Sequence, residues 1–266
     1  MPVILPKSCR PLALLALALP QLAFAQADEI QVYDGGLAAR GIFNLTLHNN
    51  FTPSGLKAAG FPGSVIADRS LNGVAEWAYG VTNWFEAGLY LPLYSVSKGL
   101  GGTINGGKIR LLFAVPNADD RKFFYGVNFE FSYNARHWDQ RRITSEIRPI
   151  VGWHLKPVDI VINPILDTTY TGGIRNLEFV PATRVARSLS DKWAVAVEEY
   201  ADVGTLRRFN PGREESHQIF GVFDHHGKSV DIEAGVGFGI TGASDRVTLK
   251  LILSHDFNPR KKGNVP

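Results

Sequence analysis

Residues 73–93, GVAEWAYGVTNWFEAGLYLPL, are the stretch that decides the fold. From Phe85 onward, apolar side chains alternate with polar or small ones, and a repeat of two residues is the repeat of a β-strand. The same alternation runs through the residues around Trp77, and the polar pair Thr82-Asn83 separates the two runs. The stretch therefore predicts a β-hairpin with one apolar face that carries aromatic side chains and one polar or small face.

This hairpin unit recurs along the chain. The alternation predicts twelve strands, at residues 41–48, 73–81, 85–93, 108–115, 123–134, 142–155, 158–168, 176–188, 193–202, 216–223, 229–241 and 247–257. An even number of strands puts both ends of a barrel on one side, and short turns alternate with longer loops, as in bacterial outer-membrane barrels. We expect the longest loops, residues 49–70 and the glycine-rich residues 94–107, on the outer side.

The first 25 residues have the pattern of a cleavable secretory signal peptide. Lys7 and Arg10 form a basic start, residues 12–19 are apolar, and residues 23–25 read A-F-A, which fits the cleavage motif. Residues 26–40 are polar and are predicted to be a periplasmic lead-in, although the sequence does not decide whether they enter the lumen of a barrel. The barrel itself is predicted over residues 41–257, and a periplasmic tail over residues 258–266.

Composition excludes several classes of protein. Cys9, the single cysteine, precedes the apolar part of the signal, so disulfides and thiolate metal sites are not expected in the exported chain. The 28 basic and 25 acidic residues nearly balance, which argues against a nucleic-acid partner. No run of about 18 apolar residues follows the signal, so a membrane-spanning helix is not expected either.

We therefore predict an all-β protein, a transmembrane antiparallel up-and-down β-barrel of about 12 strands in the outer membrane of a Gram-negative bacterium. The alternative is a soluble periplasmic β-sandwich or lipocalin-like barrel, which also has alternating strands. A soluble barrel is apolar inside and polar outside, whereas here the second face is charged and aromatic residues gather near the strand ends of the apolar face. These aromatic residues are Trp77, Tyr79, Trp84, Phe123, Tyr125, Trp153 and Trp193.

Charged residues of both signs follow the polar face, which is expected to line the lumen. They are Glu76, Glu86, Lys108, Arg110, Glu130, Arg142, Glu146, Arg148, Glu178, Arg184, Glu198, Asp231, Glu233, Lys250 and Asp256. Charges persist inside a membrane protein only if they are hydrated or paired. They indicate either a pore lining that selects solutes by charge and size, or an ion-pair network that plugs a narrow lumen. About twelve strands is a width that does not decide between the two.

Three further motifs were considered as a phosphate-binding loop, a metal site and a catalytic dyad, and none of them predicts such a site from the sequence. Residues 235–239 read G-V-G-F-G, but the motif lies in a predicted strand and precedes no helix, so it is not a phosphate-binding loop. Asp224-His225-His226 would place its side chains on opposite faces, and we predict neither a metal nor a cofactor. Ser216-His217 and Ser254-His255 split across the wall in the same way. A catalytic dyad would need partners from different strands, so an outer-membrane lipid hydrolase is the alternative to a non-enzymatic barrel.

Four stretches resemble a known family of outer-membrane barrels, the one labelled meta-pathway phenol degradation. They are EWAYGVTNWFEAGLYLPLY at 76–94, FVPATRVARSLSDKWAVAVEEYADVG at 179–204, HQIFGVFDHH at 217–226 and GVGFGITGASDRVTLKLILSHDF at 235–257. The resemblance implies a passage route for small solutes, with hydrophobic or aromatic compounds among them, and identifies no functional residue. The partners we expect are outer-membrane lipid, the barrel-assembly machinery and a small-molecule solute.

Overall fold

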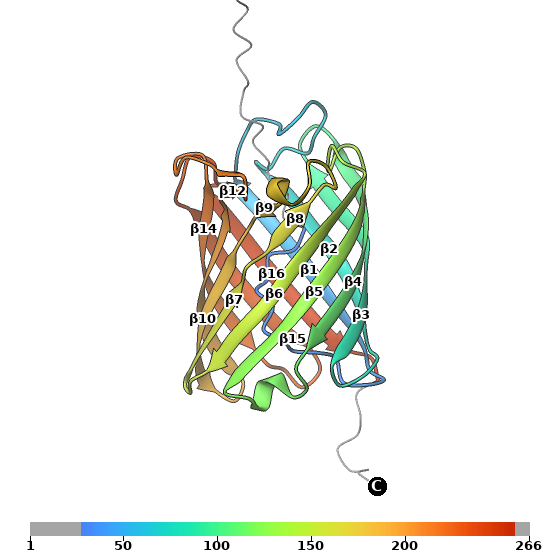
Figure 1. The fold of residues 1–266 in the computed structure, drawn as a ribbon, viewed down its shortest axis with the longest axis vertical. Helices are drawn as coiled ribbons and strands as arrows, with labels where there is room; N and C mark the ends of the chain where they lie inside the picture. The colour runs from blue at the N-terminus through green and yellow to red at the C-terminus, as the bar shows by residue number, and fades with distance from the viewer. Residues whose placement is uncertain (1–27, 259–266) are drawn as a thin grey trace, which may run out of the picture.

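The computed structural model of the protein describes residues 28–258. The predicted signal peptide, residues 1–25, and nearly all of the predicted tail, residues 258–266, lie outside the described residues. Within residues 28–258, no helix is long and apolar enough to cross a membrane. The described chain forms a closed barrel of twelve antiparallel strands, so the predicted fold class is confirmed (Figure 1).

The wall is built from long strands joined by short turns at the end where the described chain finishes (Figure 1). The strands are β1 Phe43–Ser54, β2 Ser70–Gly80, β3 Phe85–Ser97, β4 Gly101–Ala114, β5 Phe123–Asn134, β6 Ile143–His154, β7 Val158–Asn163, β8 Leu166–Thr168, β9 Glu178–Phe179, β10 Ala182–Ser190, β11 Trp193–Asp202, β12 Gly204–Thr205, β13 Arg208–Phe209, β14 Ser216–His225, β15 Asp231–Gly239 and β16 Val247–Asp256. Two short 3-10 helices, η1 Ala118–Asp120 and η2 Ile174–Asn176, lie in connections.

Sixteen strand segments make twelve wall strands because three wall strands are each interrupted once and β13 is not part of the wall. β7 continues as β8 beyond Pro164, β9 continues as β10 beyond Pro181, and β11 continues as β12 beyond Val203. Proline has no N–H to donate to a strand ladder, which explains the first two breaks. β13 folds back on β12 as a small outer hairpin. Pairing of β1 with β16, of β6 with β7 and of β7 with β10 closes the wall.

Side chains alternate between the two faces of the wall. In β5, Phe124, Asn128 and Glu130 point inward and are buried, whereas Phe131 and Tyr133 point outward and are exposed. The other long strands repeat this arrangement, with buried polar residues inside and exposed apolar residues outside. A soluble barrel would have its two faces the other way round. The arrangement therefore excludes the soluble alternative and fits a wall surrounded by lipid.

The outer loops are shorter than the sequence predicts. β1 runs to Ser54, and β3 and β4 extend through most of residues 94–107, which were expected to be a loop. Inside this extension, Asn105 Nδ2 donates a hydrogen bond to Ser95 Oγ at 2.7 Å, and Ser95 Oγ donates one to Asn72 Oδ1 at 2.6 Å. Glycines and small polar residues dominate the stretch, so its apolar alternation is too weak to reveal the strands.

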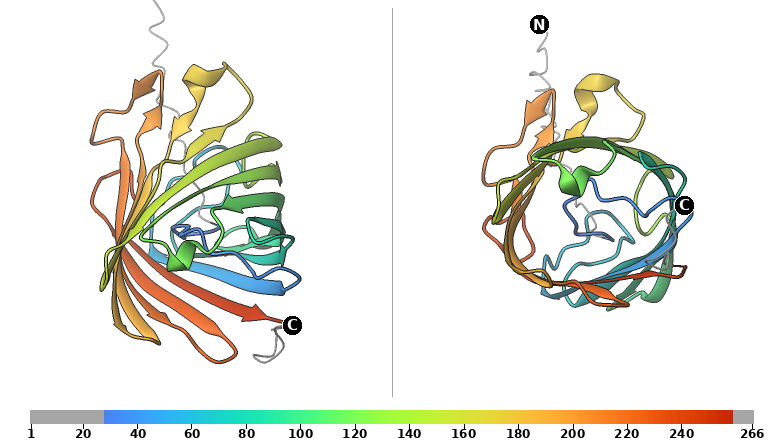
Figure 2. Two further views of the ribbon diagram at one scale, coloured as in Figure 1. Left: turned by 60° about the horizontal axis from the view of Figure 1, so that its bottom comes forward. Right: turned by 90° about the horizontal axis from the view of Figure 1, so that it is seen from below.

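The interior of the barrel contains the N-terminal segment, which we define as residues 28–42. Figure 2 shows this blue segment inside the ring of strands. Its apolar side chains face the wall: Val32 belongs to a buried cluster with Phe124, and Ile30 belongs to another with Phe220. The described residues of the predicted lead-in therefore lie in the lumen, and the apolar core of the protein lies between this segment and the inner wall.

Glycines opposite buried rings allow the inner wall to pack closely, and this predicts a stability effect. Gly237 pairs directly with Phe220, and a Cβ at Gly237 would overlap the Phe220 ring, which is fully buried. We expect Gly237→Ala to destabilise the barrel by about 1–3 kcal/mol through overpacking. Gly221→Ala is the matched control, because a Cβ there meets nothing within 4 Å. Equal urea midpoints for the two variants in detergent would contradict the prediction.

Candidate functional site

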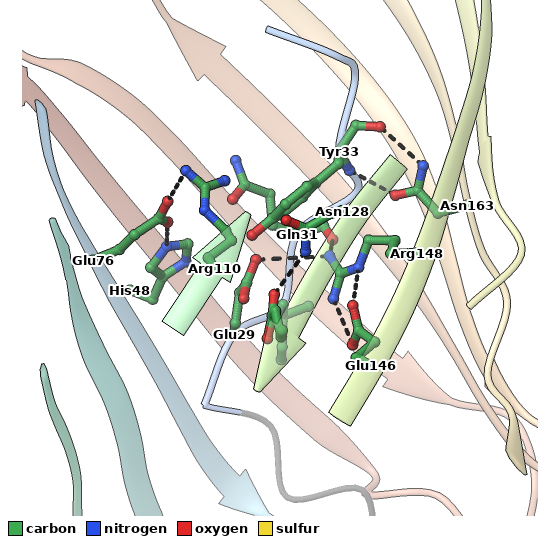
Figure 3. Close-up of polar contacts among 12 residues, drawn as sticks. Glu29, Gln31, Tyr33, His48, Glu76, Arg110, Asn128, Glu146, Arg148 and Asn163 are labelled. Atoms are coloured by element: carbon green, nitrogen blue, oxygen red, sulfur yellow. Dashed lines mark hydrogen bonds and ion pairs between the residues drawn. The ribbon is translucent and has the colours of Figure 1, made fainter. Parts of the chain in front are cut away.

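The N-terminal segment is held to one side of the lumen by hydrogen bonds from its backbone. Tyr33 N donates to Asn163 Oδ1 at 2.7 Å, and Asn163 Nδ2 donates back to Tyr33 O at 2.9 Å. Arg148 Nη1 donates to Gln31 O at 3.0 Å and lies 3.7 Å from the carboxylate of Glu29 (Figure 3). Side chains of β6 and β7 therefore hold the segment through hydrogen bonds to its backbone.

Two lysines hold the segment from other strands. Lys108 Nζ, on β4, lies 2.7 Å from the carboxylate of Asp28. Lys250 Nζ, on β16, donates to Ile30 O at 3.3 Å. Because β4 and β16 lie on either side of β1 to β3 in the sheet order, these contacts span a large part of the barrel wall.

The segment leaves the lumen beside β2 at the end of the barrel where β1 begins. Gly41 N donates to Gly80 O at 2.7 Å, and Gly80 N donates to Ile42 O at 3.1 Å. Ala38 N donates to the carboxylate of Glu86. A Cβ at Gly80 would overlap the carbonyl oxygen of Ala38, so this glycine permits the close approach of the segment to the wall.

The first cluster of charges lies against Tyr33 (Figure 3). Arg110 Nη2 lies 2.7 Å from Glu76 and also pairs with Glu86, while Glu76 lies 3.0 Å from His48 Nε2. The Arg110 guanidinium lies 5.5 Å from the centre of the Tyr33 ring. In this cluster, a cation, two carboxylates, an imidazole and an aromatic ring shield one another from water.

The same cluster continues toward β5 and β6. Lys108 Nζ lies 3.2 Å from Glu130, which also accepts a hydrogen bond from Asn128 Nδ2 at 3.0 Å. Arg148 Nε and Nη2 donate to the two carboxylate oxygens of Glu146 at 2.6 and 3.1 Å. This bidentate pairing fixes the orientation of the Arg148 guanidinium. The guanidinium carbon lies 4.4 Å from the centre of the Tyr33 ring.

The second cluster of charges spans β10, β11, β14, β15 and β16. Arg184 pairs with Glu198 and Asp224 and lies 3.4 Å from Glu233. Lys250 pairs with Glu198 and lies 2.6 Å from Glu233. The side chains of Lys250 and Glu198 are both 0% exposed. Paired charges therefore cover the inner face of the wall over these five strands.

The structure brings most of the predicted inner-face residues together but not all of them. The first cluster contains Glu76, Glu86, Lys108, Arg110, Glu130, Glu146 and Arg148, and the second contains Arg184, Glu198, Glu233 and Lys250. Glu178 lies on β9, opposite Asp167 of β8, which lies opposite Glu146 of the first cluster, and among the described residues Glu178 forms no ion pair with either cluster. Asp231 and Asp256 lie in strand ends next to the turn at residues 227–229. Whether any of these residues contacts a solute stays a prediction.

Arg142 differs from its predicted inward position. It is exposed, its guanidinium lies 5.7 Å from the outward-facing ring of Tyr133, and its Nη1 donates to Tyr133 OH at 3.0 Å. The reason is that β6 begins at Ile143, so Arg142 belongs to the turn, where strand alternation does not apply.

Several residues of the clusters were missed by the sequence reasoning. His48 and Asp224 both point inward into ion pairs. The alternation after Leu47 places His48 on the inner face, so the sequence could have identified it. Asp224 was missed because the predicted strand ended at residue 223. Asp28 and Glu29 were missed because the lead-in was not read as a second lining of the lumen.

The histidines considered for a catalytic dyad or a metal site do not have the partners that those sites need. His217 places Nδ1 3.0 Å from Glu199 and Nε2 3.2 Å from Glu215, so each ring nitrogen faces a carboxylate rather than a serine. His255 Nδ1 contacts the backbone carbonyl of Ser229. Within the described part of the chain, no group of three or more His, Cys, Asp or Glu side chains is placed to hold a metal ion.

Comparisons with known proteins agree with this architecture. No family model and no curated protein matches the chain. Among solved structures, it is similar to the COG4313 outer membrane channel from Pseudomonas putida F1, with a TM-score of 0.54 and 12% identity over 86% of this chain and 100% of that chain. It is also similar to the KdgM porin, with a TM-score of 0.52 and 6% identity over 81% of this chain and 99% of that chain. Identities this low show the fold alone, so the protein has the fold of outer-membrane β-barrels and the more specific family label stays a prediction.

Proposed function

We propose that the protein is a channel for small solutes in the bacterial outer membrane and that residues 28–42 close it. The observation that supports the proposal is that this segment lies in the lumen without being part of the wall. The ladder pairings that close the barrel run between strands, and the segment adds backbone hydrogen bonds to a strand at Gly41 and Ile42. Departure of the segment would therefore leave the strand pairings of the wall intact.

The fold supports a channel rather than a purely structural barrel. The two solved structures described above are named as a channel and a porin, and both share the wall architecture of this chain. Charges that are paired in the closed state become a hydrated lining once the segment moves, because a polar inner face is tolerated in an open barrel. Insertion in the membrane by the barrel-assembly machinery, after export by the signal peptide, belongs to the same proposal.

Aromatic compounds are the solute class that we propose. The support comes from the Tyr33 ring, which lies against the guanidinium groups of Arg148 and Arg110, at 4.4 and 5.5 Å. Its hydroxyl group is hydrogen bonded to Tyr90 OH. Guanidinium groups attract the faces of aromatic rings, so departure of the segment would free a ring-binding surface in the lumen.

The proposal is tested by single-channel conductance in planar bilayers. We expect the wild type to show rare openings, and a variant that lacks residues 28–38 to show larger and longer current steps. Gly80→Ala should act in the same direction, because its Cβ would displace the segment where it contacts the wall. Gly221→Ala, with open space at its Cβ, is the control.

Each outcome of this experiment decides something. Equal currents from the wild type and the deletion variant would show that the segment is not the gate. A deletion variant that is folded, as judged by heat-modifiable migration in gels, but passes no current would overturn the channel proposal in favour of a structural barrel. Reduction of the current by added phenol, with no reduction by a sugar of similar size, would support the aromatic solute class.

A further inference from the structure

The loop between β5 and β6 carries an unusual concentration of positive charge. We call residues 135–142 the basic rim. Three of these eight positions are exposed arginines, Arg136, Arg141 and Arg142, and none of them forms a salt bridge with any described residue. The single carboxylate of the rim, Asp139, accepts a hydrogen bond from the backbone N of Arg141 at 2.6 Å. The guanidinium groups of Arg136 and Arg141, and the donors of Arg142 that do not contact Tyr133, are therefore available to an external anion.

The basic rim is held in a fixed conformation. Trp138 is buried, and the backbone of the rim is tied to neighbouring segments, with Ala135 N donating to Asn105 O at 2.7 Å. His137 O accepts from Val65 N at 3.0 Å. A ligand that bound the arginines would not have to order this loop, so little conformational entropy would be lost on binding.

The position of the rim identifies the kind of ligand. Tyr133 and Ile143 face each other directly in the ladder below it, and both are 59% exposed on the outward face. The guanidinium of Arg142 lies over the Tyr133 ring. Arg142 thus lies at the edge of the apolar surface, and Arg136 and Arg141 belong to the same loop, at the end of the barrel opposite to the described C-terminal end (Figure 1). In a membrane this is the level of the lipid headgroups of the outer leaflet.

We infer that the basic rim binds the phosphate groups of a bisphosphorylated lipid in the outer leaflet. Arginine forms two parallel hydrogen bonds with a phosphate oxygen pair, and three arginines match the charge of two phosphates. The acyl chains of the same lipid would lie against Tyr133 and Ile143. This contact is on the outside of the wall and does not depend on whether the lumen conducts.

The test measures the binding of purified lipid A with two phosphates to the full-length barrel in detergent, by native mass spectrometry. We expect the variant Arg136→Gln/Arg141→Gln/Arg142→Gln to bind lipid A at least about tenfold more weakly, because it removes the charged hydrogen-bond donors that would contact the phosphates. The matched control is Arg121→Gln/Lys122→Gln/Arg187→Gln, which removes three exposed cations at the opposite end of the barrel.

Two results would overturn the inference. One is equal loss of lipid A binding in the rim variant and in the control, which would indicate a general effect of charge. The other is equal binding of lipid A and its dephosphorylated form to the wild type, a comparison that needs no variant to fold. Selective weakening in the rim variant, together with weaker binding of the dephosphorylated lipid, supports it. Phosphatidylglycerol in place of lipid A should bind more weakly, because it carries one phosphate.

Discussion

Lys250→Met is expected to lower the unfolding free energy of the barrel by about 3–5 kcal/mol, the usual result of removing one partner of a buried ion pair. Methionine nearly matches the volume of lysine, so the loss does not come from a cavity. It comes from the carboxylates of Glu198 and Glu233, which both contact Lys250 and would be left with Arg184 as their cation. Urea unfolding followed by tryptophan fluorescence measures the change.

A double variant separates charge from packing in this cluster. Removing Glu198 as well, in Lys250→Met/Glu198→Gln, takes away one of the unpaired carboxylates and should recover at least about 1 kcal/mol, because residues in one network are not additive. Lys192→Met, at an exposed turn, is the control and should change stability by less than about 0.5 kcal/mol. Additive losses in the double variant would show that the pairs do not stabilise one another.

The fold could be predicted from the sequence because, in a barrel surrounded by lipid, apolar and polar residues alternate along each strand with a repeat of two residues. The apolar residues around Phe131 and Tyr133 in β5 show why: they alternate with buried polar residues over the whole strand. Strand boundaries were predicted less well where apolar and polar residues do not alternate clearly. The end of β3 and the start of β4 were missed because their side chains are small or polar. Pro164 predicts the interruption between β7 and β8, whereas the break at Pro181, between β9 and β10, was missed.

The candidate site could be predicted in part. Alternation tells which face a charged residue occupies, and it placed Arg110 and Lys250 on the side where the structure has them. It does not tell which partner a charge meets, because ion pairs join strands that are far apart in the sequence. The N-terminal segment was harder still. Residues 29–33, EIQVY, do alternate, but the apolar residues face the inner wall instead of lipid, and nothing local distinguishes the two.

Glu29 is the residue from which we expect a pH dependence of the gate. It belongs to the N-terminal segment and not to the membrane-spanning strands, its side chain is 2% exposed, and its carboxylate oxygens accept no hydrogen bond from the described residues. Burial raises the pKa of Glu29, Glu130 and Glu76 also raise it, and Arg148 and His48 lower it; together they bring the pKa of Glu29 to about 7. These groups, from β5, β2, β6 and β1, are the charges that face it.

The direction of the effect follows from proton linkage. The docked segment holds a proton on Glu29 that a released, solvated segment gives up with an ordinary pKa of 4.5. Docking is therefore fully stabilised below about pH 4.5 and loses this stabilisation as the pH rises through about 7. Between pH 5 and pH 8 we expect the open population of the wild type to rise by on the order of a hundredfold.

Glu29→Gln keeps the neutral form at every pH, so its channel should stay closed and should lose the pH dependence. A nitroxide label at Asp34→Cys reports docking independently of current, because Asp34 is exposed in the segment and the chain has a single cysteine, Cys9, in the predicted signal. Label mobility that rises with pH in the wild-type background and not with Glu29→Gln would establish the switch, even in a barrel that passes no current. Because the imidazole of His48 also acts on Glu29, a slope that survives in Glu29→Gln and disappears in His48→Gln would assign the switch to His48 and refute this role of Glu29.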